Sequence, residues 1–261
     1  MPDNLAVTRH LARFVAETEW DALAPPVVHQ TKRALVNFFA VTLTGCREPA
    51  IEIALQSLSA FSGGRQATMI GRPERLDALS AAFLNAASAN VLDFCDTHVP
   101  TVIHPTAPLA PSLFALGELR RVSGRDLILA FVLGAEIECR IGLAMSPSHY
   151  RRGWHITATC GVFGAAAGSA KLLALQAEPM VFALGLAATQ AAGLCECLGT
   201  PAKSVHVGKR RATVCGRLYW PRKALPARPS RSPAAKAIST RLPRARNFRF
   251  SPADSARAGK S

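Results

Sequence analysis

The sequence predicts an all-α protein, and two features carry that prediction. Up to about residue 200, apolar residues recur with the period of an α-helix in one segment after another. Only residues 65–71, "RQATMIG", have the composition of a short strand. With 261 residues and 49% hydrophobic content, the chain also has enough apolar surface for a sizeable core.

The expected helices follow one another closely along the chain. The segment 25–45 opens with two prolines, which a first helical turn tolerates, and ends at a glycine suited to a C-cap. The last two segments are rich in Ala and Gly on all sides, which is typical of buried helices whose backbones approach closely. The expected helices are 4–20, 25–45, 76–94, 107–124, 125–145, 157–175 and 178–194.

Basic charge is concentrated in the last fifth of the chain. Residues 1–208 hold 16 Lys and Arg against 16 Asp and Glu, whereas 209–261 hold 15 basic residues and one acid, Asp254, so 15 − 1 = +14 is the whole net charge. We therefore expect an incomplete helical domain over 1–209 and a disordered, Pro/Arg-rich tail over 210–261. Such a tail would bind nucleic acid only non-specifically. It is also what a shifted reading frame encodes, so we expect a truncated or frame-shifted gene product.

The cysteines and the N-terminus predict a soluble, cytoplasmic chain. Seven cysteines are an odd number without framework spacing, so no disulfides are expected. The sequence does not open with a charged and then apolar signal segment. Charged residues interrupt the longest apolar stretches before they reach the roughly 20 residues of a membrane span, so no membrane partner is expected.

A first polar segment, "NVLDFCDTHVPTVIHP", follows an apolar helix. Asp93, Asp96 and Thr97 are spaced i, i+3 and i+4, so they share one face if the preceding helix extends by a turn. His98 and His104 lie on the loop that follows. For any one of these residues the plain alternative is a cap or a satisfied surface group. Together they favour a site, because such groups are costly to bury without partners.

Two further segments are basic. In "YRRGWHITATCG", Arg151, Arg152 and His155 precede a helix of small residues, an arrangement that suits a carboxylate or phosphate. In "GTPAKSVHVGK", three basic residues recur every third position and share a helical face, which suits anions. These three are Lys203, His206 and Lys209. The alternative for both segments is a solvated loop or face.

Four segments of the chain form a recognisable series: "LDFCDTH", "HPTAPLAPSLFALGE", "RGWHITATCGVFGAAAGSAKLLAL" and "GTPAKSVHVGK". In order and spacing, they resemble the MmgE/PrpD family of 2-methylcitrate dehydratases, cis-aconitate decarboxylases and relatives. The resemblance implies a large helical domain with a smaller lid domain, homodimeric assembly, and activity without metal or organic cofactor. The catalytic residues that it implies are Asp93, Thr97, His104, His155 and Lys203. The residues expected to help bind substrate are Asp96, Arg151, Arg152, His206 and Lys209.

The implied activity is that of a hydro-lyase of propionate metabolism, acting on a di- or tricarboxylate. Removal of water needs a base for the proton next to a carboxylate, an acid for the hydroxyl, and cations that hold the carboxylates. His104 and His155 are the acid and base candidates, Asp93 orients or acts as a base, Thr97 binds substrate, and Lys203 clamps a carboxylate. A cis-aconitate-type decarboxylase or a related epimerase is the alternative within the family.

Two alternatives come from other classes of protein: a metal-dependent hydrolase and a basic-tailed nucleic-acid-binding protein. The candidate metal ligands are Asp93, Asp96, His98, His104 and His155. The chain also departs from the family, since Cys95 stands where an aspartate is usual and the lid is missing. We therefore expect weak turnover from this chain, because an open site leaves its charges screened by water.

Overall fold

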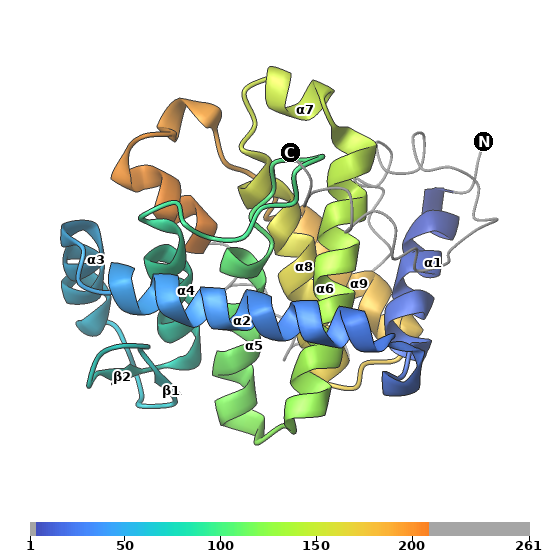
Figure 1. Ribbon diagram of the computed structural model, residues 1–261, viewed down its shortest axis with the longest axis horizontal. Coiled ribbons are helices and arrows are strands. Elements are labelled where there is room, and N and C mark those ends of the chain that lie inside the picture. Colours follow the sequence, from blue (N-terminus) through green and yellow to red (C-terminus); the bar gives the residue numbers. More distant parts are fainter. Residues whose placement is uncertain (1–3, 209–261) are drawn as a thin grey trace.

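The computed structural model describes residues 4–208 and confirms the all-α prediction for them (Figure 1). The tail expected at 210–261 lies outside these residues. None of the helices between residues 4 and 208 is long and apolar enough to cross a membrane. The helices are α1 (Asn4–Glu17), α2 (Pro25–Gly45), α3 (Pro49–Ser59), α4 (Ala78–Asn90), α5 (Thr106–Arg120), α6 (Gly124–Met145), α7 (Ser148–Arg151), α8 (Ile156–Leu172) and α9 (Ala177–Ala188).

Shorter elements complete the fold. Strands β1 (Ala67–Thr68) and β2 (Arg75–Leu76) pair antiparallel in a small hairpin. Two 3₁₀ turns, η1 (Trp20–Ala22) and η2 (Cys195–Cys197), lie in connections, and residues 201–208 are helical. Only part of the strand expected at 65–71 therefore forms.

Local signals in the sequence start several helices. Two prolines open α2, as expected. The Asp77 side chain caps α4 by accepting hydrogen bonds from the backbone N–H groups of Leu79 and Ser80, both at 3.0 Å. Ser123 and Asp126 form a capping box at the start of α6. These contacts satisfy N–H groups that the first turn of a helix leaves without intrahelical partners.

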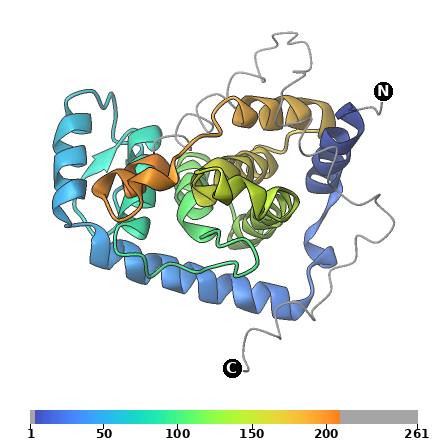
Figure 2. The same ribbon diagram turned by 90° about the horizontal axis from the view of Figure 1, so that it is seen from above.

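The centre of the molecule is the packing of α5, α6 and α8. Figure 1 shows α2 crossing in front of this bundle, and Figure 2 shows it running along one side. Helix α8 packs against α5, α6, α9 and α1. Every residue of α8 from Ile156 to Ala170 is buried. The prediction of a buried helix rich in small residues is thus confirmed, although α8 ends three residues earlier than expected.

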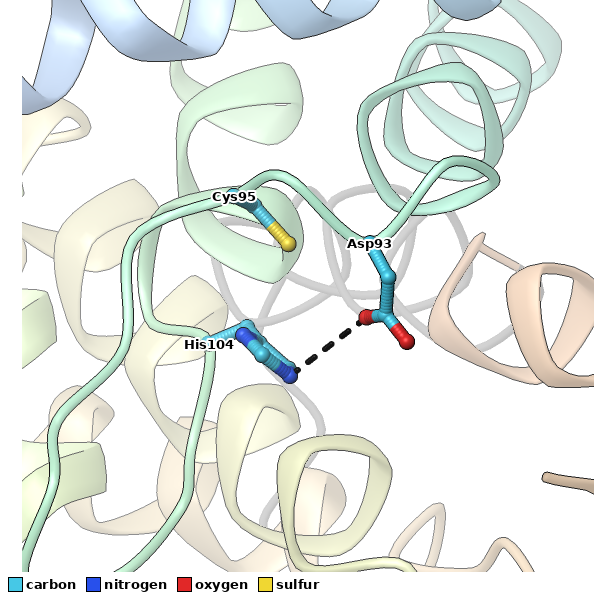
Figure 3. A group of neighbouring side chains, drawn as sticks. All are labelled: Asp93, Cys95 and His104. Carbon is cyan, nitrogen blue, oxygen red and sulfur yellow. Dashed lines mark ion pairs between the residues drawn. The ribbon is translucent and has the colours of Figure 1, made fainter. Parts of the chain in front are cut away.

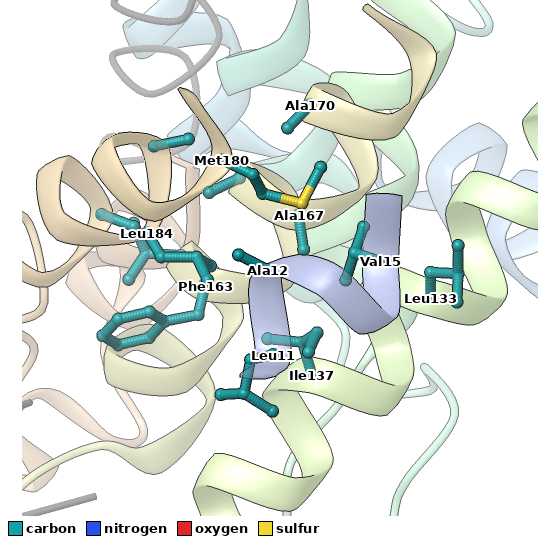
Figure 4. Packing of buried hydrophobic residues seen from close by; sticks show 14 of the residues in the cluster. Leu11, Ala12, Val15, Leu133, Ile137, Phe163, Ala167, Ala170, Met180 and Leu184 are labelled. Carbon is teal, nitrogen blue, oxygen red and sulfur yellow. The ribbon is translucent and has the colours of Figure 1, made fainter. Parts of the chain in front are cut away.

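Three apolar clusters form the core. The largest joins α1, α6, α8 and α9 (Figure 4). A second, around Phe38, joins α2 to α5 and also includes Cys95 and Val207. A third holds α3 and the hairpin against α4. The second cluster supports the loop between α4 and α5 and the helical residues 201–208, which carry several of the predicted site residues.

The structure corrects several boundaries. Helix α3 was not expected from the sequence. Helix α4 ends at Asn90 rather than at residue 94, and α9 ends at Ala188 rather than at residue 194. The glycine at the end of α2 is not a left-handed C-cap, because Cys46 follows it in right-handed helical conformation. A Cβ added at Gly45 would lie 2.2 Å from the Ser88 carbonyl oxygen, so close approach of α2 to α4 requires the glycine.

Gly45→Ala should therefore destabilise the protein by about 1–3 kcal/mol, because backbone of α4 cannot yield as a flexible side chain would. Gly63→Ala is the matched control, since a Cβ there meets nothing within 4 Å. Its effect should stay within about 0.5 kcal/mol. Urea unfolding of both variants measures the difference. Equal stabilities would show that α2 and α4 are not held at this distance in solution.

Candidate functional site

The loop between α4 and α5 carries most of the predicted site residues. Asp93 adopts a left-handed backbone conformation with φ of 62°, so the chain turns away from the helix axis directly after α4. The prediction that Asp93, Asp96 and Thr97 share one helical face is therefore wrong. Negative charge at a helix C-terminus opposes the helix dipole, which gives a physical reason for the early end of α4.

His104 is held in a defined orientation at the end of this loop. Its Nδ1 lies 3.1 Å from the backbone carbonyl oxygen of Asp96 and 3.1 Å from Oγ1 of Thr97. A carbonyl oxygen only accepts hydrogen bonds, so Nδ1 carries a proton. The other nitrogen, Nε2, faces Asp93, with its carboxylate oxygen Oδ1 at 3.6 Å (Figure 3). Asp93, Thr97 and His104 are thus brought together.

Lys203 joins this group from the far end of the described chain. Its ammonium group forms an ion pair with Oδ1 of Asp93. The lysine side chain is only 9% exposed, whereas that of Asp93 is 58% exposed. The aspartate therefore links a buried cation to solvent and to His104. Among the residues that sequence reasoning selected, this pair spans the longest distance along the chain.

His155 and His206 lie beside one another. His155 precedes α8, and its backbone N–H donates to the carbonyl of Gly193 at 3.0 Å. The two imidazole rings meet edge to face with centroids 5.7 Å apart. Gly193, with φ of 139°, allows this approach, because a Cβ there would lie 3.2 Å from Nδ1 of His206.

Backbone and side-chain contacts connect the group of Asp93, His104 and Lys203 with the pair of His155 and His206. Thr157, two residues after His155, accepts a hydrogen bond from the backbone N–H of His104 at 3.2 Å. His206 lies three residues after Lys203 in the helical residues 201–208, so the two are neighbours on that helix. Residues from all three polar segments therefore lie in one region of the molecule. The catalytic roles assigned to them stay predictions.

Asp96 is directed differently from Asp93. Its carboxylate accepts hydrogen bonds from the backbone N–H of Thr106 at 3.2 Å and from the Thr106 hydroxyl at 2.5 Å, at the start of α5. Burial raises the pKa of this carboxyl above its ordinary value, and the Thr106 hydrogen bonds oppose that rise only in part. The structure thus gives Asp96 a contact that anchors the loop, and its substrate-binding role stays a prediction.

This raised pKa makes a pH prediction for Asp96→Asn. In the wild-type chain the folded-state pKa of Asp96 exceeds its unfolded-state pKa. Asp96 therefore contributes most to stability at low pH, and its contribution falls as pH rises from the unfolded-state pKa through the folded-state pKa. The variant lacks this titration. Its stability relative to wild type should therefore increase between pH 4 and pH 7 in urea unfolding. A difference that stays constant, or that changes in the opposite direction, would contradict the prediction.

Several supporting residues were missed by the sequence reasoning. Asn37 of α2 accepts from the backbone N–H of Asp96 and donates to the carbonyl of Phe94, both at 3.2 Å. Asn90 donates to Sγ of Cys95 at 3.4 Å. Asn37 lies 59 residues from its partner Asp96, so no local pattern could have revealed it. Burial raises the pKa of Cys95 to about 11, so its thiol is protonated at neutral pH.

The remaining predicted residues are not part of this connected group. Arg151 and Arg152 are exposed at the end of α7, and Lys209 lies outside the described residues. The metal set that the sequence left as an alternative is not assembled either, because Asp96 bonds to Thr106 and His98 bonds to the Thr101 hydroxyl at 2.7 Å. Within residues 4–208, the donor set close enough to hold an ion is Asp93, Cys95 and His104.

The fold and site together define a helical protein in which an imidazole, a carboxylate, a hydroxyl and an ammonium group converge. Comparison with known proteins narrows this class. Residues 9–216 match the MmgE/PrpD N-terminal domain, and the chain belongs to the MmgE/PrpD family. The resemblance seen in the sequence is thereby confirmed.

Curated relatives are named for one activity. The chain is 32% identical to the cis-aconitate decarboxylase-like protein oryM of Aspergillus oryzae, over 72% of this chain and 41% of that protein. It is 30% identical to cis-aconitate decarboxylase of Aspergillus terreus, over 72% and 40% respectively. For the human cis-aconitate decarboxylase the values are 28%, 78% and 43%. The chain thus spans about two fifths of the length of these relatives.

Proposed function

We propose that this chain is part of a lyase that acts on a di- or tricarboxylate, and that decarboxylation of a cis-aconitate-like substrate is its reaction. The named relatives favour decarboxylation over the dehydration expected from the sequence. The observation that carries the proposal is the linked set of Lys203, Asp93, His104 and Thr97. These groups supply a cation for a carboxylate and a proton carrier next to it.

The chemistry of decarboxylation fits this set. When the carbon–carbon bond breaks, its electron pair stays on the substrate carbon, carbon dioxide leaves, and an acid must deliver a proton to that carbon. The Nε2 position of His104 can carry that proton, while Asp93 at 3.6 Å stabilises the protonated ring. Lys203 can hold a substrate carboxylate by a charge-assisted hydrogen bond. The Thr97 hydroxyl keeps the His104 ring oriented.

Dehydration of 2-methylcitrate is the second candidate, and the His155–His206 pair favours it. Dehydration needs both a base for the proton next to a carboxylate and an acid for the departing hydroxyl. The second imidazole centre at His155 and His206 supplies the additional group, which decarboxylation does not require. In this reaction His104 and His155 share the acid and base roles.

The wider setting of the activity also remains a proposal. Arg151, Arg152, His206 and Lys209 would add positive charge around a bound polycarboxylate. By family resemblance we propose a cytoplasmic homodimer that works without metal or organic cofactor. Sedimentation of the purified chain tests the dimer.

Ligand binding is the first test, since the chain spans two fifths of its relatives. Calorimetry should show binding of cis-aconitate in the presence of a chelator, and much weaker binding of acetate. Lys203→Met should weaken cis-aconitate binding about 10- to 100-fold, because each charge-assisted contact contributes about 1.5–3 kcal/mol. Leu43→Ala, a change at an exposed residue of α2, should have no effect. Equal affinity for acetate and cis-aconitate would rule out a carboxylate clamp.

Product analysis distinguishes the two reactions. Incubation with cis-aconitate should release carbon dioxide and a dicarboxylate, whereas incubation with 2-methylcitrate should release water without carbon loss. Nuclear magnetic resonance in deuterated water identifies both products. The same assay measures how weak turnover by this chain is. Loss of water from 2-methylcitrate without any decarboxylation would reverse the order of the two candidates.

A further inference from the structure

Three different donor atoms face one another on the loop between α4 and α5. The carboxylate of Asp93, the thiol of Cys95 and Nε2 of His104 point toward a common space in Figure 3. One carboxylate oxygen, the sulfur and a ring nitrogen of these residues all lie within 4.8 Å of one another. One short stretch of chain therefore supplies an oxygen, a sulfur and a nitrogen donor to a single point.

The surroundings of His104 match those of a metal-binding histidine. Its Nδ1 proton is directed at the Asp96 carbonyl oxygen at 3.1 Å. Histidines that bind metals commonly make this hydrogen bond through their second nitrogen, which fixes the ring and leaves the lone pair of the first nitrogen for the ion. Here that lone pair, on Nε2, faces the Asp93 carboxylate at 3.6 Å. Ligands of a tetrahedral zinc ion are about 3.3–3.8 Å apart.

The types of donor select the class of cation. A thiolate, an imidazole and one carboxylate suit zinc and cobalt(II), whereas magnesium and calcium prefer sites made of oxygen donors. Three protein ligands leave a fourth tetrahedral position for water or a small anion. Cys95 decides this preference, because it contributes the only sulfur of the set.

We propose that Asp93, Cys95 and His104 bind a thiophilic divalent cation of the zinc class, in competition with the ammonium group of Lys203. When the cation binds, the Cys95 S–H bond breaks, a sulfur–metal bond forms, and the proton passes to solvent, without any change of oxidation state. The cation replaces Lys203 on the Asp93 carboxylate, where the lysine is its counter-ion in the structure. This inference does not depend on the proposed function. A cation bound here occupies two groups of that function and would inhibit it.

Cobalt(II) is the probe for this site, because a thiolate bound to it gives a charge-transfer absorption in the near ultraviolet. Titration of the reduced, full-length chain should give this band with one cobalt ion per chain, and zinc should displace the cobalt. Magnesium should not. Cys95→Ser should abolish the band. Cys197→Ser is the matched control, since Cys197 lies in η2 outside the donor set, and it should keep the band.

Two further variants separate a metal site from a general loss of structure. His104→Gln should weaken cobalt binding at least tenfold, since it removes a nitrogen ligand. Lys203→Met should strengthen binding about tenfold, because it removes the positive charge that competes for Asp93. An unfolded variant would lose affinity rather than gain it. A band that is absent from the wild-type chain, that survives Cys95→Ser, or that weakens in Lys203→Met would overturn the proposal.

Discussion

Replacing Asp93 by asparagine is expected to lower the free energy of unfolding by about 2 kcal/mol. The reason is the unequal burial of its ion pair with Lys203. The lysine side chain is 9% exposed and the aspartate side chain 58% exposed. The variant therefore leaves a nearly buried ammonium group opposite a neutral amide, and little water can compensate for the lost charge.

Lys203→Met is the contrasting variant for this pair. It leaves the carboxylate of Asp93, which water hydrates, and keeps an apolar side chain in the place of the lysine stem. Its cost should stay below about 1 kcal/mol. Urea unfolding at pH 7 compares the two variants with the wild-type chain. If Lys203→Met proved as damaging as Asp93→Asn, or more so, burial of the lysine would not govern the energetics of the pair.

Phe38→Ala is expected to have the largest effect on stability, about 3–5 kcal/mol. The Phe38 side chain is 1% exposed, and its ring stacks on that of Phe114 with centroids 5.8 Å apart. Its cluster also contains Cys95 and Ala107, which lie on either side of His104 in the sequence. A cavity at this position should therefore loosen the loop that carries the site as well as lower stability.

Two measurements follow these separate consequences. Chemical unfolding gives the loss of stability, and hydrogen exchange of residues 91–105 reports on the loop. Phe39→Ala is the control, since Phe39 is 36% exposed, and it should cost about 1–2 kcal/mol. The two chains are compared at equal global stability. If the hydrogen-exchange protection of residues 91–105 is then the same in Phe38→Ala as in the wild-type chain, the cluster does not support the site.

Much of the fold follows from local patterns in the sequence. The boundaries expected for α2 are those observed, because prolines and apolar periodicity act within a few residues of one another. Helix α3 was missed although it begins with Pro49 and buries Ile51 and Leu55. Its apolar residues pack against α4 and the hairpin, so their role becomes clear only when those partners are placed.

The sequence selected the segments that carry the candidate site, and their catalytic role stays a prediction, but it did not give their geometry. Helical spacing suggested that Asp93 and Asp96 share a face. The left-handed backbone at Asp93 instead directs its carboxylate toward His104 and Lys203, while the Asp96 carboxylate bonds to Thr106. Propensity alone does not predict a left-handed aspartate, because that conformation persists only where surrounding contacts enforce it.

By itself, the sequence determined the helical class, most helix positions, the concentration of basic charge after residue 208, and the segments that resemble the MmgE/PrpD family. All of these depend on residues near one another in the chain. Only the tertiary structure decided that Lys203 pairs with Asp93, 110 residues away, and that Cys95 lies beside Asp93 and His104 as a third donor. Pairings at such separations depend on how whole helices pack, which no local pattern encodes.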